Sequence, residues 1–190
     1  MDCTICELYD YADSFWKNEI CIIFFQMNHI RYVPIRIKEI TQERLGKCVH
    51  TTLGTGKECE MVLISTQGSS NEKIKTVIRH ELVHYALSMM NLKHDDADAA
   101  FKISCEYFNA DWYKELNELE SKIYDTYNSY FKKAVDLCHG DEELSHHIGD
   151  IISIMGSKNI TSVDLINEQL GRADFIIDAI QTLKNAHARK

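Results

Sequence analysis

The sequence has little proline and little glycine, and it lacks a long hydrophobic run. One Pro and eight Gly among 190 residues exclude a collagen-like or proline-rich chain. The longest apolar run, residues 20–25, is far shorter than the about 20 residues that a transmembrane helix needs. Because 45% of the residues are hydrophobic, the chain can form an apolar core, which excludes intrinsic disorder. We therefore expect an ordinary globular protein without membrane association.

Basic residues are also few, and the cysteines show no pairing pattern. Lys and Arg number 21 against 29 Asp and Glu, so the formal net charge is −8. A broad nucleic-acid-binding face would show a surplus of clustered Lys and Arg, and this balance does not support association with DNA. The seven cysteines are odd in number and scattered, and the first residues do not resemble a secretory signal. We expect a cytoplasmic protein in a reducing compartment.

The first third of the chain predicts one helix followed by a small sheet. Apolar residues recur at spacings of three and four over residues 4–18, which indicates an amphipathic helix. Four short segments rich in β-branched residues follow, at residues 20–25, 32–40, 47–53 and 60–65. Gly54 and Gly56 indicate a hairpin turn between the last two. We expect three or four of these segments to form an antiparallel sheet.

From residue 69 onward the pattern is helical. Ser69-Ser-Asn-Glu72 has the S-x-x-E form of a capping box, and a helix is predicted over residues 71–90. Further helices are predicted at residues 99–108, 112–137, 142–155 and 162–187. The predicted fold class is therefore α+β, in which a small antiparallel sheet packs on the helix at 71–90. A composition shift near Asp111 divides the chain into a front domain, residues 1–110, and a C-terminal all-helical extension, residues 111–190.

One short motif inside the predicted helix carries chemistry. His80-Glu-Leu-Val-His84 has the form H-E-x-x-H. Residues four apart lie on the same face of a helix, so both imidazoles can point at one zinc ion, about 2.0 to 2.1 Å away. Glu81 lies beside them, where its carboxylate can take a proton from water activated by the metal. We predict His80 and His84 as zinc ligands and Glu81 as the general base of peptide-bond hydrolysis.

A catalytic zinc also needs a third protein ligand and an open fourth position. His94 is the nearest downstream histidine, ten residues after His84, in a polar segment that can fold back from the end of the helix. Asp96, Asp98 and Glu106 are alternatives, because carboxylates complete some H-E-x-x-H sites. We predict His94 as the third ligand and leave the three carboxylates open.

The motif stands in a series of short segments with a distinctive order, namely Val33-Pro-Ile-Arg-Ile37, Leu45-Gly-Lys47, Val62-Leu-Ile-Ser65, Ile78-Arg-His-Glu-Leu-Val-His-Tyr85 and His94-Asp-Asp-Ala-Asp98, followed by Phe101. Over about residues 8–110 this order resembles an SprT-like metallopeptidase domain. The resemblance implies a zincin-like fold, zinc held by His80, His84 and His94, and Glu81 as general base. It also implies distant kinship with Spartan proteases, which digest proteins crosslinked to DNA.

These observations predict a zinc-dependent metallopeptidase that hydrolyses peptide bonds of a protein or peptide substrate. Two alternatives stay open. One is a regulatory peptidase dedicated to a single partner, such as a repressor. The second is a non-enzymatic adapter, stabilised by metal, whose helical extension carries the function.

Overall fold

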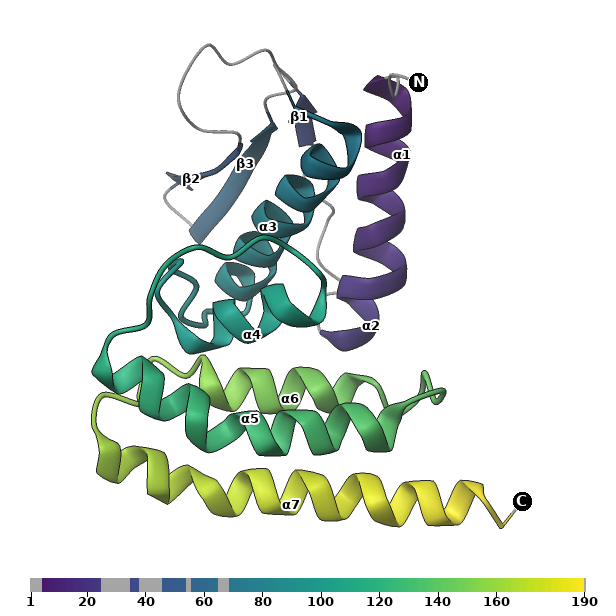
Figure 1. The fold of residues 1–190 in the computed structure, drawn as a ribbon, viewed down its shortest axis with the longest axis vertical. Helices are drawn as coiled ribbons and strands as arrows, with labels where there is room; N and C mark the ends of the chain where they lie inside the picture. The colour runs from purple at the N-terminus through teal and green to yellow at the C-terminus, as the bar shows by residue number, and fades with distance from the viewer. Residues whose placement is uncertain (1–4, 25–34, 38–45, 54–55, 65–68, 190) are drawn as a thin grey trace.

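The structure is a computed structural model, and it describes residues 5–24, 35–37, 46–53, 56–64 and 69–189. Side chains are described at residues 6–24 and 69–189. Every residue in those two ranges lies in a helix or in the turns and loops that join helices. The described molecule is therefore mainly helical (Figure 1).

Helices and a small group of strands both contact the H-E-x-x-H helix, α3 (Figure 1). Helix α1 lies along α3, α4 lies below it, and α5, α6 and α7 form a layer across the lower end of the molecule (Figure 1). The helices have the bounds α1 Ile5–Phe15, a π-helical turn η1 Trp16–Ile20, α2 Cys21–Ile23, α3 Asn71–Met89, α4 Ala99–Tyr107, α5 Glu118–Cys138, α6 His146–Met155 and α7 Val163–His187.

The predicted α+β fold with an antiparallel sheet is wrong, because the molecule is built mainly from helices. The structure describes three strands, β1 Ile35–Ile37, β2 Gly46–Leu53 and β3 Gly56–Ile64. Their order is β1-β3-β2; β2 pairs antiparallel with β3, but β1 pairs parallel with it. The predicted turn residues 54–55 lie outside the described residues.

The apolar run at residues 20–25 is helical rather than a strand, as far as it is described. Ile20 ends η1, and α2 follows it directly. Ile20, Ile23 and Phe24 are almost fully buried. A short run that is buried on all sides has no polar face, so its periodicity does not distinguish a strand from a buried helical turn. Helix α2 packs on α6, where a Cβ on Gly149 would lie 2.1 Å from the Ile23 carbonyl oxygen.

The prediction of α3 is confirmed, apart from its cap and its last residue. Ser70, one residue after the predicted cap, has extended backbone, and its side chain accepts a hydrogen bond from the Lys73 amide at 3.3 Å. This bond satisfies one of the amides that the first turn of a helix leaves unpaired. Helix α3 thus holds both histidines of the motif in regular helical geometry.

The helix predicted at residues 112–137 begins later in the structure than the sequence indicated. Helix α5 begins at Glu118, because Asn117 has extended backbone and its side chain accepts a hydrogen bond from the Glu120 amide at 3.0 Å. Residues 110–117 form a connection without regular structure, which runs across α3. Helix α6 also begins four residues later than predicted, at His146 rather than at residue 142.

The division into residues 1–110 and 111–190 stays a prediction, but the two parts are in close contact. Helices α2 and α4 pack on α6, and α4 packs on α5. The buried hydrophobic side chains of both parts form one cluster. Among the helices of the described ranges, none is long and apolar enough to cross a lipid bilayer.

Candidate metal centre

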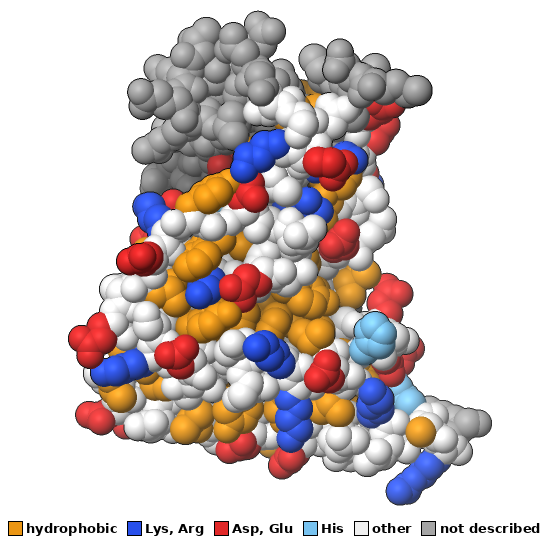
Figure 2. All heavy atoms as spheres, viewed as in Figure 1, with side chains coloured by type: hydrophobic (Ala, Val, Ile, Leu, Met, Phe, Trp, Pro, Cys, Tyr) orange, Lys and Arg blue, Asp and Glu red, His pale blue; other side chains and the backbone are white. Residues whose placement is uncertain are grey.

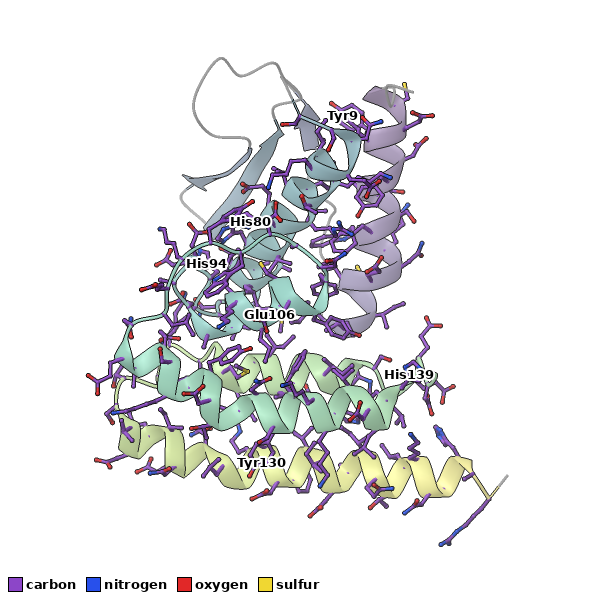
Figure 3. All side chains as sticks on the ribbon, viewed as in Figure 1. Tyr9, His80, His94, Glu106, Tyr130 and His139 are labelled. Carbon is purple, nitrogen blue, oxygen red and sulfur yellow. The ribbon has the colours of Figure 1, made fainter. Side chains whose placement is uncertain are left out.

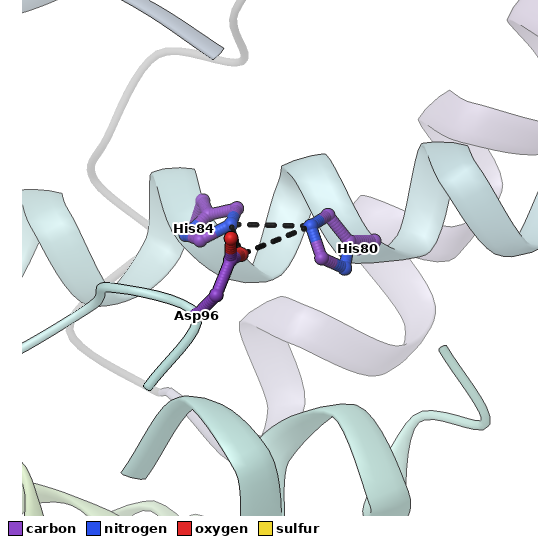
Figure 4. A group of neighbouring side chains, drawn as sticks. All are labelled: His80, His84 and Asp96. Atoms are coloured by element: carbon purple, nitrogen blue, oxygen red, sulfur yellow. Dashed lines mark hydrogen bonds and ion pairs between the residues drawn. The ribbon is translucent and has the colours of Figure 1, made fainter. Parts of the chain in front are cut away.

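Two elements bring three possible metal ligands together. Helix α3 carries His80 and His84 one turn apart, and the segment between α3 and α4 folds back so that Asp96 faces them (Figure 4). One nitrogen from each imidazole and one oxygen of the carboxylate lie within 4.8 Å of one another. The side chains of His80 and His84 are each 15% exposed and that of Asp96 is 34% exposed, so the group is partly buried but reachable from solvent.

The distances within this group match the size of a zinc site. His84 Nε2 lies 3.2 Å from His80 Nε2 and 3.0 Å from Asp96 Oδ1, and His80 Nε2 lies 3.5 Å from the same oxygen. Four ligands placed tetrahedrally about 2.0 to 2.1 Å from zinc are separated from one another by about 3.3 Å. The three separations are therefore close to those between three ligands on one face of a tetrahedral zinc site, which a fourth ligand would complete.

Backbone carbonyls set which nitrogen of each histidine faces the group. His80 Nδ1 donates to the Asp111 carbonyl oxygen at 2.7 Å, and His84 Nδ1 donates to the His94 carbonyl oxygen at 2.5 Å. A carbonyl oxygen only accepts, so each Nδ1 must carry a proton. In the neutral rings each Nε2 then presents a lone pair. This is the arrangement that orients metal-binding histidines in proteins.

Three acceptor atoms consequently face one another. Burial lowers the pKa of His80, which favours its neutral form. The hydrogen bond with His84, which requires a proton on His84 Nε2, holds the pKa of the Asp96 carboxyl well below its usual range, so Asp96 is ionised. Two lone pairs and a carboxylate at these distances repel one another unless they share a proton or a metal cation. The group thus has the donor set and the charge to hold a divalent ion.

Phe101 of α4 holds the two imidazoles from one side. Its ring is fully buried, stacks on the His84 ring at a centroid distance of 3.9 Å, and meets the His80 ring edge-on at 5.0 Å. These contacts restrict the rotation of both histidine side chains. Phe101 therefore helps to fix the orientation of both imidazoles.

The connection before α5 holds Asp96 and α3 from the opposite side. Trp112 Nε1 donates to the Asp96 carbonyl oxygen at 2.9 Å, and Lys114 Nζ lies 3.3 Å from Asp96 Oδ2. The Asp111 carboxylate accepts hydrogen bonds from the Lys73 ammonium and the Thr76 hydroxyl, which lie on the first two turns of α3. The sequence pattern did not reveal these contacts, because it placed the start of the next helix at residue 112. Asn117-Glu-Leu-Glu120, an N-cap residue followed by Glu, is the pattern that marks the true start.

The structure places Asp96, one of the carboxylates left open as a third ligand, beside His80 and His84, and the identity of the third ligand stays a prediction. The His94 ring does not belong to the group: its Nδ1 lies 2.9 Å from the Leu92 carbonyl oxygen. His94 contributes its backbone carbonyl, which orients His84. Figure 3 shows His94 on the same side of the molecule as His80.

Asp98 and Glu106, the remaining carboxylates considered as third ligands, are placed elsewhere. Asp98 directly precedes α4, and its Oδ2 accepts from the Asp95 amide at 2.6 Å. Glu106 accepts from the Tyr124 hydroxyl at 2.7 Å. Neither belongs to the group of three. Glu81, the predicted general base, follows His80 on α3 and is 6% exposed; its role stays a prediction.

Comparison with known proteins gives no match: no family model, no curated protein and no solved structure matches the chain. The resemblance to SprT-like domains therefore stays a prediction, and the site is interpreted from its own geometry.

A second group of possible ligands lies at the start of α6, where His146, His147 and Asp150 come within 4.8 Å of one another. All three belong to the first two turns of one helix, and Asp150 is 48% exposed. The positive end of the helix dipole disfavours a cation at this place. The first group, with its carbonyl-bonded imidazoles, is the stronger candidate.

Proposed function

We propose that the protein is a zinc-dependent peptidase whose metal is held by His80, His84 and Asp96. One observation carries the proposal. The two imidazoles of an H-E-x-x-H helix turn their unprotonated nitrogens toward each other and toward a carboxylate, at the separations of a tetrahedral zinc site. Three protein ligands and one open position are the arrangement of catalytic rather than structural zinc sites.

The metal and Glu81 have different tasks in this proposal. Zinc, when bound, lowers the pKa of a coordinated water to about 7 and polarises the carbonyl group of the substrate. The carboxylate of Glu81 takes the proton from the attacking water and then delivers it to the nitrogen of the leaving amine. One peptide bond and one water are consumed, and one carboxylate and one amine are formed. The low exposure of Glu81 keeps bulk water from competing for this proton.

The proposed substrate is a protein or peptide chain in the cytoplasm. The four cysteines whose side chains the structure describes are free thiols, as expected in a reducing compartment. On the face shown in Figure 2, basic and acidic side chains are interspersed rather than separated. Together with the net charge of −8, this supports a protein substrate over a DNA partner.

The test measures zinc content and cleavage on the same preparations. We expect about one zinc per wild-type chain by elemental analysis, and slow cleavage of fluorescein-labelled unfolded casein. Glu81→Gln should keep the zinc and lose cleavage, because it removes the base but no ligand. His84→Ala should lose both.

Two matched variants serve as controls. His139→Ala removes an exposed histidine at the far end of α5, away from the site (Figure 3). Glu72→Gln makes the same change as Glu81→Gln at an exposed position of α3. Both should behave as the wild type. Cleavage by Glu81→Gln at the wild-type rate would overturn the mechanism, and a wild-type chain without zinc affinity would overturn the proposed function.

A further inference from the structure

The segment that carries Asp96 is held by the C-terminal helices as well as by α3. The Lys93 amide donates to the Gly156 carbonyl oxygen at 2.7 Å, at the end of α6. The Lys93 ammonium donates to Glu120 Oε1 at 2.7 Å and to the Ile160 carbonyl oxygen at 2.9 Å. A single side chain therefore ties this segment to α5 and to the connection between α6 and α7.

Glu120 binds the segment at both of its ends. Its Oε1 accepts from Lys93, and its Oε2 accepts from the amide of Ala99, the first residue of α4, at 2.9 Å. Lys93 and Ala99 lie three residues before and three residues after Asp96. One carboxylate thus holds the chain symmetrically around the proposed third ligand.

This arrangement is buried and closely packed. The Glu120 side chain keeps 4% of its exposure and the Lys93 side chain 18%. Gly156 has no room for a side chain, because a Cβ there would lie 3.0 Å from Leu92 Cβ and 3.1 Å from Ala100 Cβ. The segment therefore has little freedom to move away from the C-terminal layer while the pair is intact.

Stability alone is a weak reason to bury such a pair. Removing two charges from water costs several kcal/mol per ion, and apolar side chains of similar size often replace a buried pair without loss of stability. In some proteins a buried pair fixes one geometry instead of adding stability. In this chain the geometry that it fixes is the position of Asp96 between Lys93 and Ala99.

We propose that Glu120, through Lys93 and Ala99, is a positioning residue that holds Asp96 at the third corner of the metal centre. The helices after residue 111 are then part of the centre and not a separate extension. The contacts of Trp112 and Lys114 with Asp96 come from the same part of the chain and act in the same direction. This inference rests on the proposed function, because it requires that Asp96 ligates a metal.

The experiment is a double-mutant cycle on zinc affinity in the full chain, measured by competition with a chromophoric chelator. Loss of a partner that orients a metal ligand typically weakens affinity about 10- to 100-fold, and we expect this for Glu120→Gln. In an Asp96→Ala background the same substitution should have no further effect, because its target is absent. A general structural role would weaken zinc binding equally in both backgrounds.

A matched control and a spectrum complete the design. Glu118→Gln removes a carboxylate of the same helix that pairs with the exposed Lys122, and it should leave zinc affinity unchanged. With Co²⁺ in place of zinc, the visible absorption of Glu120→Gln should shift toward that of Asp96→Ala, which reports the loss of the same ligand.

A second variant covers the case in which Glu120→Gln does not fold. Lys93→Met with Glu120→Met replaces the pair by apolar side chains of similar length, which preserves folding but removes the hold on Ala99. It should also bind zinc about 10- to 100-fold more weakly. Wild-type affinity in either variant, or equal losses in both backgrounds of the cycle, would overturn the inference while leaving the proposed function intact. Absence of zinc binding by the wild type would overturn both.

Discussion

Zinc should stabilise the folded chain by an amount that depends on Asp96 and not on the His94 side chain. A ligand that binds only the folded state adds RT ln(1 + [L]/Kd), which is about 2.7 kcal/mol at a free zinc concentration of 100 times Kd. For a chain of this length each kcal/mol raises Tm by about 2 to 4 °C. We therefore expect a rise in Tm of about 5 to 11 °C over the metal-free protein.

Asp96→Asn should remove most of this rise. The amide oxygen carries no charge, and the third corner, 3.0 Å from His84 Nε2 and 3.5 Å from His80 Nε2, loses its anion. A loss of about 100-fold in affinity brings the same zinc concentration down to about one Kd, where the stabilisation is about 0.4 kcal/mol. The expected rise in Tm is then only about 1 to 2 °C.

Thermal unfolding with and without zinc, followed by circular dichroism, measures both values. Asp98→Asn makes the same change of charge two residues away and should keep the full rise, because Asp98 lies outside the group of three. His94→Ala should keep it as well, since the backbone carbonyl that orients His84 is retained. A full rise in Asp96→Asn together with its loss in His94→Ala would refute our assignment and restore His94 as the third ligand.

Three further predictions concern side-chain packing and helix capping. Phe101→Ala should lower the free energy of unfolding by about 3 to 5 kcal/mol, because a fully buried ring is lost. It should also weaken zinc binding, because both imidazoles lose the ring that they pack against. Urea denaturation measures the first effect and a zinc titration the second. Gly149→Ala should cost about 1 to 3 kcal/mol in urea, since its Cβ would meet the Ile23 carbonyl oxygen, whereas Gly171→Ala, with open space around it, should be neutral or stabilising. Asn117→Ala should cost about 1 kcal/mol through the lost cap of α5, and an unchanged urea midpoint would contradict that assignment.

The site could be predicted from the sequence to the extent that it is local. His80 and His84 share one face of α3 because of their spacing, and Ser70 marks the start of that helix through a hydrogen bond three residues away. Neither inference requires knowledge of distant contacts. Helix α4 begins at the predicted residue, and α7 begins one residue after the predicted start.

The third candidate ligand of the site could not be predicted in this way. His94 and Asp96 lie two residues apart in one polar loop, and both residue types bind zinc. The choice between them depends on Lys93, Glu120 and Trp112, which hold the loop so that Asp96 faces the histidines. A contact between residues 93 and 120 leaves no periodic trace in the sequence.

The prediction of the fold class was wrong for a related reason. The apolar residues 20–24 suit either a strand or a buried helical turn, and packing against α6 decides for the turn. In the same way, the parallel pairing of β1 with β3 joins segments far apart in the chain.

The sequence by itself determined the composition, the helix that carries H-E-x-x-H and the two imidazoles on one face, because these follow from interactions within a few residues. Only the tertiary structure decided the mainly helical fold, the placement of Asp96 beside the two histidines and the contacts of the C-terminal helices with the segment that carries it. Those depend on which distant side chains can be buried together, and burial is a property of the whole chain.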